Sequence, residues 1–354
     1  MEKLESDPKT RYCFLTEWFD FHAQLYRQYE FFFYPSDSTI EMRRTFLKRS
    51  KSEIRLIDLF LGAAINVHSR QLVIKDYGDE YTRKHLKNQL TSSLLVIKPE
   101  GVPFLGEILT GLHEEKFSCC RMRMANLDDS IANQLNTSGL NGTSIVLEVL
   151  RADAYNTLNK LVESEFEKYV KTPSVRSFLH IPSDEKDVDR QLNAVFGTNI
   201  PRTATFKNWK YGPIIKDIQK HFKISDMELV HLDNRNGEEF LEVYKGVVPE
   251  YHLMLTQLTA GPLIAMELVG DGDIVQKFRE LAGPGDPALA KQLRPDSLRA
   301  KYGVDKVKNA VHCTDLPEDG VLEVIDLNRR ANISLKSFNK MTFSDYKVTL
   351  LKLG

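Results

Sequence analysis

The stretch Asn309-Ala310-Val311-His312-Cys313-Thr314-Asp315 gathers one histidine, an amide, a hydroxyl and a carboxylate within a few residues. Arg279 and Arg299 precede it, and Glu323 follows it. Neutral imidazole is a nucleophile near pH 7, and paired arginines hold the oxygens of a phosphoryl group well. A carboxylate on the far ring nitrogen, from Glu323 or from the aspartate of the stretch, would fix the tautomer. The stretch therefore predicts a phosphohistidine site, against the alternative of a histidine with a structural role.

The pattern NxxH followed by a small residue, a hydroxyl and Asp resembles the active-site signature of the nucleoside diphosphate kinase family. The resemblance covers residues 212–323. Within that range Gly261–Glu267 resembles the family's buried third strand, Arg279–Pro284 its phosphate-arginine segment and Arg294–Arg299 its PGTIR loop. The resemblance implies transfer of the γ-phosphate of Mg²⁺-bound nucleoside triphosphates to nucleoside diphosphates, in a ping-pong cycle.

Carried over position by position, the resemblance assigns seven residues to the catalytic site. They are His312 as the phosphorylated nucleophile, Glu323 as its orienting carboxylate, Arg279 and Arg299 as phosphate contacts, Asn309 as the sugar-hydroxyl contact, Thr314 at the family's serine and Tyr244 beside the histidine. The resemblance implies no metal ligand from the chain. Mg²⁺ would enter with the nucleotide, and an inactive protein would need no cofactor.

Three features depart from the family pattern. His252 stands where the family has its base-stacking phenylalanine, and Gly285 stands where it has a phosphate-binding threonine. An insertion of a few residues falls around Ala288–Ala290. Because stacking and phosphate contacts both contribute to nucleotide affinity, these departures predict weaker nucleotide binding than the family pattern implies.

Composition sets wide bounds on the protein. The chain has 354 residues, of which 42% are hydrophobic, enough for two or three domains. A net charge of -1 and a pI near 6.8 give no electrostatic reason to expect nucleic acid. Four cysteines without paired metal spacing favour a reducing compartment. No apolar run reaches membrane-spanning length, and the N-terminus does not resemble a signal peptide.

Residues 11–90 read as short aromatic-rich strands, such as Tyr12–Phe19 and Gln28–Tyr34, which predict a small β module. The segments Phe31–Glu41, Thr45–Arg49 and Leu72–Thr82 resemble the DM-ten domain. That domain is a barrel of the pleckstrin-homology type that recurs in ciliary proteins. The resemblance brings no catalytic residue with it.

An internal repeat follows the β module, with four landmarks paired in the same order. The pairs are Gly106–Leu109 with Gly212–Ile215, Phe117–Met124 with Phe222–Leu229, Gly142–Leu150 with Gly261–Val269, and Val195–Gly197 with Lys301–Gly303. The sequence therefore predicts an α+β protein. It has a pleckstrin-homology-like module over 1–90, two incomplete ferredoxin-like βαββαβ modules over 91–202 and 203–323, and a C-terminal extension over 324–354.

The two copies differ in what they keep. The first keeps the family's Lys98-Pro99 motif, but it lacks the arginine pair and presents Thr203–Phe206 where the NxxH motif belongs. Phenylalanine has no nitrogen to phosphorylate, so the first copy is predicted to be inactive. The second copy keeps the histidine motif but lacks the Lys-Pro loop.

The run Thr203–Trp209 is too short to serve as both the fourth strand of the first copy and the first strand of the second. Loss of a central strand leaves two rows of backbone groups without hydrogen-bond partners, whereas loss of an edge strand leaves one such row. We therefore expect the run to serve the second copy, beside Leu263–Met266. The first copy would then end on an open edge, covered by a neighbouring protein or by residues 324–354.

Two classes of function remain open, and the sequence favours the first. A DM-ten domain followed by two kinase-like modules is the layout of one ciliary member of the family. That layout implies a structural protein of the axoneme that binds tubulin of doublet microtubules and other axonemal proteins. It also implies a link to the gamma-tubulin complex and a cytoplasmic pool. The alternative is an active nucleoside diphosphate kinase that binds nucleoside di- and triphosphates.

Overall fold

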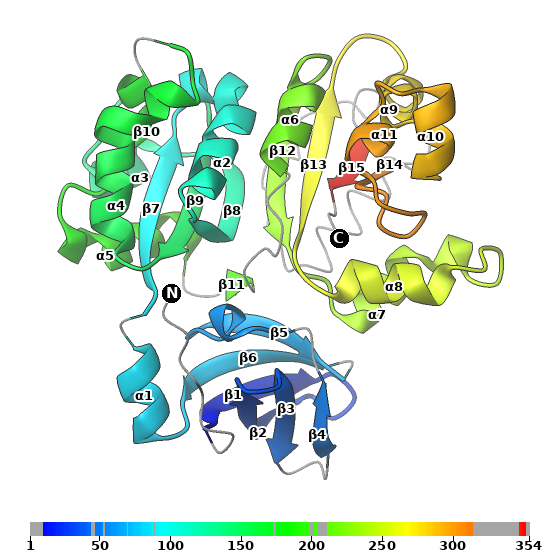
Figure 1. The fold of residues 1–354 in the computed structure, drawn as a ribbon. Coiled ribbons are helices and arrows are strands. Elements are labelled where there is room, and N and C mark those ends of the chain that lie inside the picture. Colours follow the sequence, from blue (N-terminus) through cyan, green and yellow to red (C-terminus); the bar gives the residue numbers. More distant parts are fainter. Residues whose placement is uncertain are drawn as a thin grey trace.

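The computed structural model describes residues 10–43, 47–51, 54–68, 70–87, 89–172, 175–197, 202–203, 211–313 and 347–351. These residues form two β-sheets with helices packed on them, which confirms the α+β class with a β module ahead of kinase-like modules (Figure 1). Among the described residues, no helix combines the length and the apolar composition that crossing a membrane requires.

The N-terminal module is a seven-stranded sheet in the order β11-β5-β6-β1-β2-β3-β4. Its core is aromatic and aliphatic, with Phe14, Phe31 and Leu72 fully buried. Asp79 starts helix α1 by accepting a hydrogen bond from the Thr82 amide. The elements are β1 (Tyr12–Asp20), β2 (Leu25–Tyr34), β3 (Thr39–Arg43), β4 (Leu47–Lys51), β5 (Ala63–Val67), β6 (Arg70–Tyr77), α1 (Glu80–Leu86) and β11 (Arg202–Thr203).

The second sheet has eight strands in the order β10-β7-β9-β8-β12-β13-β15-β14. Its first half is made by the first kinase-like copy, whose four strands, numbered along the chain within the copy, lie in the order 4-1-3-2. Runs such as Leu94–Ile97 are buried on both faces, because helices cover both sides of these strands. The elements are β7 (Thr91–Ile97), α2 (Leu105–Glu114), β8 (Ser118–Asn126), α3 (Asp129–Leu135), β9 (Thr143–Arg151), α4 (Ala154–Lys160), β10 (Leu179–His180) and α5 (Val188–Phe196).

The second half repeats this order in reverse, so that β8 lies beside β12 at the centre of one continuous sheet. Asp233 and Asp273 cap the N-termini of two of its helices through their side chains. The elements are α6 (Tyr211–Gln219), β12 (Lys223–Val230), α7 (Asn234–Phe240), α8 (Tyr251–Thr259), β13 (Leu263–Val269), α9 (Ile274–Ala282), α10 (Pro287–Leu293), α11 (Leu298–Tyr302), β14 (Val311–Cys313) and β15 (Lys347–Leu351).

Strand β15 comes from the C-terminal extension and fills the central place between β13 and β14 (Figure 1). It pairs antiparallel with both neighbours, with Ala265 and His312 both opposite Leu350. The expectation that Thr203–Trp209 would pair beside Leu263–Met266 was therefore wrong. A sheet position can be filled by any extended segment that reaches it, wherever that segment lies in the sequence.

Strand β10 fills the edge of the first half, where its Leu179 pairs with Ile97. The expected open edge was therefore wrong as well. Arg202 and Thr203 pair parallel with Ala63 and Ala64 of β5, in the N-terminal sheet. Residues 204–210 lie outside the described residues. The domain limits at 90, 202 and 323 remain predictions, but β11 and β15 pair across them.

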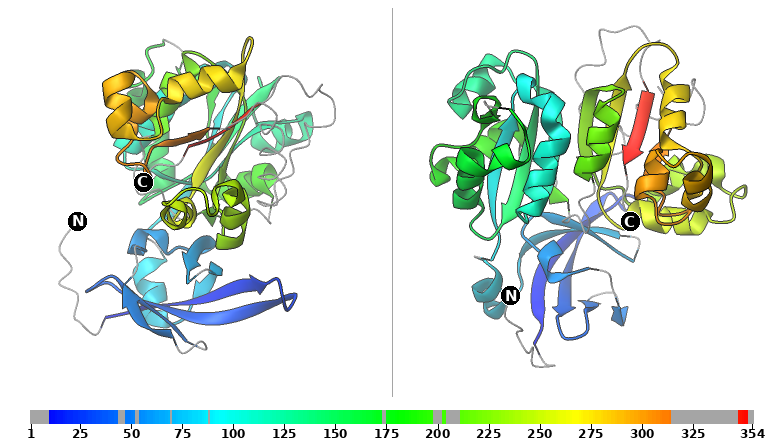
Figure 2. Two further views of the ribbon diagram at one scale, coloured as in Figure 1. Left: turned by 90° about the vertical axis from the view of Figure 1, so that its right-hand side faces the viewer. Right: turned by 45° about the horizontal axis from the view of Figure 1, so that its top comes forward.

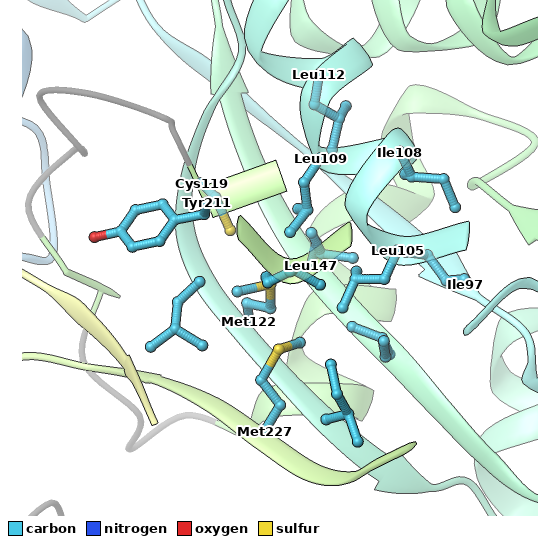
Figure 3. Close-up of a cluster of buried hydrophobic side chains, with 14 of the residues drawn as sticks. Ile97, Leu105, Ile108, Leu109, Leu112, Cys119, Met122, Leu147, Tyr211 and Met227 are labelled. Carbon is cyan, nitrogen blue, oxygen red and sulfur yellow. The ribbon is translucent and has the colours of Figure 1, made fainter. Parts of the chain in front are cut away.

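Two helices in equivalent places, α2 and α6, cross closely at the junction of the halves. A Cβ on Gly106 would lie 2.6 Å from the Lys216 backbone nitrogen and 2.8 Å from the Gly212 carbonyl oxygen. Only glycine permits that approach of two backbones. Around the crossing, Leu109 and Tyr211 join one apolar cluster that spans both halves (Figure 3).

The N-terminal module packs against both halves of the larger sheet. Arg202 reaches from β11 to the fully buried Glu148 of β9, with 2.7 Å between Nη2 and Oε1, and Arg121 holds the same carboxylate at 2.6 Å. On the other side, Asn66 Nδ2 donates to the carbonyl oxygens of Leu232 and Thr259, at 3.0 and 2.7 Å. These polar contacts position the three modules against one another.

Candidate active site

The candidate nucleophile, His312, lies on β14 at the edge of the eight-stranded sheet. Its neighbours Val311 and Cys313 are buried, and Ala310 before the strand has a positive φ of 75°. A left-handed conformation of a residue with a side chain costs on the order of 1 kcal/mol and occurs often at functional sites. The strained residue lies two positions before the histidine of the motif.

Two aromatic rings from the second half orient the His312 imidazole. Phe240, at the end of α7, has its ring centre 5.2 Å away at an interplanar angle of 68°. Tyr244 has its centre 6.3 Å away at 83°. Both are edge-to-face contacts, which restrict rotation of the ring. The structure thus places Tyr244 beside the histidine as expected, and it adds Phe240, which sequence reasoning missed because no motif marks that position.

Arg299, on α11, braces the strand that carries the histidine. Its Nε and Nη2 donate to the Val311 carbonyl oxygen at 3.2 and 3.0 Å, and Nη1 donates to the Gly283 carbonyl oxygen at 2.8 Å. Its Nη2 also lies 3.6 Å from Cys313 Sγ. A guanidinium group has five N–H donors, so most of them serve the backbone here. The predicted phosphate contact of Arg299 would have to use the rest or displace these bonds.

The other predicted residues surround the same turn. Arg279 lies near the end of α9, which packs against β14, and Asn309 Nδ2 donates to the Gly285 carbonyl oxygen at 3.4 Å. The structure therefore brings Arg279, Arg299 and Asn309 together around residues 283–285, close to His312. Thr314 and Glu323 lie outside the described residues.

His252, which stands at the base-stacking position, is exposed on α8. Its ring makes an edge-to-face contact with the buried Tyr251, at 5.3 Å between ring centres. Its roles toward a nucleotide, like those of the site residues above, remain predictions.

The first half holds a histidine that the sequence interpretation missed. His180 lies on β10, at the edge beside β7, where the fourth strand of the first copy belongs. The sequence interpretation matched Thr203–Phe206 to the motif position but expected this edge to stay open, and Thr203 pairs with β5 instead. A short apolar run, Phe178–Ile181, ended by Pro182, was the signal that could have marked an edge strand.

Comparison with known proteins finds one family model and several relatives. The family model described as nucleoside diphosphate kinase matches residues 202–327. The nucleoside diphosphate kinase homolog 7 proteins of Mus musculus and Rattus norvegicus are both 38% identical, over 89% of this chain and 92% of theirs. The Aquifex aeolicus nucleoside diphosphate kinase, in an orthorhombic crystal form, is 30% identical over 33% of this chain and 82% of that one, with a TM-score of 0.31.

The chain therefore belongs to the nucleoside diphosphate kinase family. The homolog 7 relatives match along nearly the whole chain, including the N-terminal β module, and not only over the residues of the family model. This confirms the resemblance inferred from the NxxH motif and from the order of the modules.

Proposed function

We propose that this protein is a structural component of the axoneme in cilia and flagella, where it binds tubulin of doublet microtubules from within. The layout of a DM-ten-like module ahead of two kinase-like modules supports this role, as does the likeness to homolog 7 along the whole chain. Other axonemal proteins and the gamma-tubulin complex are further partners in this proposal, and a cytoplasmic pool would supply assembly.

The observation that carries the proposal is how polar contacts join the three modules. Glu148 is fully buried between two arginines, one of which, Arg202, belongs to the strand β11 of the N-terminal sheet. Breaking a buried pair of this kind leaves an uncompensated charge, at roughly 3–5 kcal/mol. A body held in one arrangement presents its surfaces at fixed spacing, which suits a scaffold on a regular lattice.

The β1–β2 ribbon is the part of this body that we expect to contact the partner. It extends from the N-terminal module (Figure 2), and Leu25 and Tyr26 near its tip are 44% and 67% exposed. Exposed apolar side chains close together often mark protein interaction surfaces. Both residues also border a concave surface with Trp18 and Arg70.

Co-sedimentation with purified microtubules tests the proposal. The wild-type chain should pellet with microtubules, and Leu25→Glu with Tyr26→Glu should weaken binding by about tenfold or more, because charge is driven into an apolar contact. The matched control is Val243→Glu with Val247→Glu, which changes two apolar residues of the second half that are still more exposed, at 74% and 76%. Failure of the wild-type chain to bind microtubules, and its absence from purified axonemes, would contradict the proposal.

A second candidate function, phosphoryl transfer through His312, is favoured by a specific register. Leu351 of β15 and Ile97 of β7 lie opposite equivalent residues, Ile264 and Ile145. In the sequence each is followed by a lysine, Lys352 and Lys98, although Lys352 lies outside the described residues. In the sequence, the C-terminal extension thus has a lysine directly after its strand, as the family's Lys-Pro motif does, but no proline follows that lysine.

Labelling with γ-labelled ATP and Mg²⁺ tests this second candidate. An acid-labile phosphoenzyme should form and should lose its His312 component in His312→Ala. Arg299→Ala should slow labelling of His312 by about 30-fold, as expected for about 2 kcal/mol of charge-assisted hydrogen bonding. His221→Ala, which changes an exposed histidine, is the control. Phosphate mapped to His312 at the wild-type rate in Arg299→Ala would show that Arg299 is only a structural brace.

A further inference from the structure

Helices α7 and α8, together with the turn between them, form one packed unit of the second half. We call residues 231–259 the α7–α8 hairpin. A Cβ on Gly237 of α7 would lie 2.7 Å from Thr259 Cγ2 and 2.9 Å from Leu255 Cδ1, both on α8. The absence of a side chain on Gly237 therefore lets the two helices pack closely. The hairpin also has its own buried apolar cluster around Leu241, so a displacement of one helix carries the other with it.

The N-terminal module holds both ends of this hairpin. On β5, Asn66 Nδ2 donates to the carbonyl oxygens of Leu232, which precedes α7, and Thr259, which ends α8, at 3.0 and 2.7 Å. Gln71 lies directly opposite Asn66 on β6, and its Nε2 donates to the His231 carbonyl oxygen at 3.1 Å. Because these acceptors lie at the two ends of the hairpin, the position of the N-terminal module determines where the hairpin lies.

A third contact reaches α7 from the turn of the β1–β2 ribbon. Arg235 lies at the start of α7, and its Cζ is 5.6 Å from the centre of the Phe21 ring. A guanidinium group over an aromatic face is attracted to that face. Figures 1 and 2 both show α7 and α8 next to the N-terminal sheet. The N-terminal module thus contacts the hairpin at both ends and on its first helix.

The same hairpin carries the two aromatic rings that contact His312. Phe240 ends α7, and Tyr244 follows in the turn. Their ring centres lie 5.2 and 6.3 Å from the centre of the imidazole. Because edge-to-face contacts depend on the placement of both rings, a shift of the hairpin changes the surroundings of the His312 ring.

We propose that the N-terminal module positions the imidazole of His312 by holding the α7–α8 hairpin, with Asn66 and Gln71 as the positioning residues. Both act through the hairpin and its two aromatic rings. The consequence for phosphoryl transfer rests on the second candidate function. The position of the ring does not rest on it, and a measurement on a chain without activity can reveal it.

NMR of the full chain with ¹³C-labelled histidine tests the proposal. The ring signal of His312, identified as the one missing from His312→Gln, should shift in Asn66→Leu, because leucine resembles asparagine in size but has no donor. The matched control, Thr16→Val, removes a buried hydrogen bond to the Tyr29 carbonyl oxygen within the N-terminal sheet and should leave the signal in place. An unchanged signal in Asn66→Leu, or an equal shift in Thr16→Val, would overturn the proposal.

Hydrogen exchange distinguishes a displaced hairpin from an unfolded module. In Asn66→Leu, the amides of α7 and α8 should exchange about tenfold faster or more, as expected for the loss of two hydrogen bonds. Strands β1 and β2 should keep their protection. Equal loss of protection in β2 and α7 would show that Asn66 only stabilises its own module, and it would overturn the proposal.

Two variants of Gln71 provide a loss and a rescue. Gln71→Glu replaces the donor with a carboxylate that faces the His231 carbonyl oxygen, so the His312 signal should shift. Gln71→Lys keeps a donor and should retain the wild-type signal. Equal shifts in the two variants would contradict the role of Gln71 as a donor.

Labelling with γ-labelled ATP and Mg²⁺ connects the ring position to chemistry. Asn66→Leu should slow phosphorylation of His312 by about tenfold or more, because a misplaced nucleophile reacts slowly, and Thr16→Val should match the wild type. The two proposals fail separately. A wild-type chain that takes up no label contradicts the second candidate function, whereas a His312 signal that does not respond to Asn66→Leu contradicts the positioning role.

Discussion

The two halves of the larger sheet reach the same strand order by different routes of the chain. In the first half, the central strand β7 opens the module, and the edge is filled early by β10, before α5. In the second half, the central strand β15 comes from the end of the chain. Each position in the sheet needs a strand to pair its neighbours' backbone N–H and C=O groups. The comparison shows that segments from different places in the chain can supply that strand.

The halves also differ in charge where they meet. Arg121 and Arg123 of β8 occupy the places of Asp226 and Glu228 on β12, since both strands have a register shift just before them. Arg123 lies directly opposite Glu228 across the junction. Two identical copies would place like charges opposite each other, so this reversal favours pairing of the two halves within one chain.

Deleting residues 345–354 should produce the largest difference in stability between the two halves, because it removes the central strand of the second half only. We expect that half to lose roughly 5 kcal/mol or more, about the stability of a small domain. Hydrogen exchange should then show loss of protection in β12 and β13 but not in β7 and β9. Unchanged protection in β13 would mean that β15 does not belong to the folded sheet.

Gly106→Leu should separate the halves at the crossing of α2 and α6. The new side chain would meet the backbone of Lys216 and Gly212, and we expect a loss of about 3 kcal/mol in the free energy of unfolding. Chemical denaturation measures it. Gly285→Ala is the matched control, because a Cβ there meets nothing within 4 Å. Equal stability of the two variants would show that α2 and α6 do not cross closely at Gly106.

Arg123→Glu should destabilise the junction by about 2 kcal/mol, because it sets two carboxylates opposite each other. The swap of Arg123→Glu with Glu228→Arg should recover part of the loss, and a double-mutant cycle on denaturation midpoints measures the coupling. A coupling energy near zero would show that the charge reversal does not specify the pairing.

The smallest expected effect is pH-dependent and concerns Glu267 of β13. Burial raises its pKa to about 7, so the folded chain keeps a proton that the unfolded chain releases near its ordinary value. Its contribution to stability is complete below the unfolded pKa and is lost as the pH rises through about 7. Glu267→Gln should therefore match the wild type near pH 4.5 and be more stable by about 1–2 kcal/mol at pH 8.

Thermal unfolding across pH 4.5–8 checks this sign. Glu238→Gln, at an exposed carboxylate, should follow the wild type throughout. A Glu267→Gln variant that is less stable than the wild type at pH 8 would contradict the prediction.

Much of the fold followed from local patterns. The paired landmarks Phe117–Met124 and Phe222–Leu229 became the facing strands β8 and β12, and the motif around His312 lies where α9 and α11 meet β14. Periodicity and motif spacing are local properties, so a single sequence carries them. Phe240 was not predicted, because its role depends on two rings that only folding brings close together.

By itself, the sequence determined the order of the modules, the repeat within the kinase-like part and the residues of the His312 motif. Only the tertiary structure decided that β15 completes the second half, that β11 joins the N-terminal sheet and that β10, which carries His180, fills the edge expected to be open. The physical reason is that a strand's sequence records its tendency to be extended and which face is apolar. Its partner is chosen by whichever unpaired backbone edge the folded chain brings within reach.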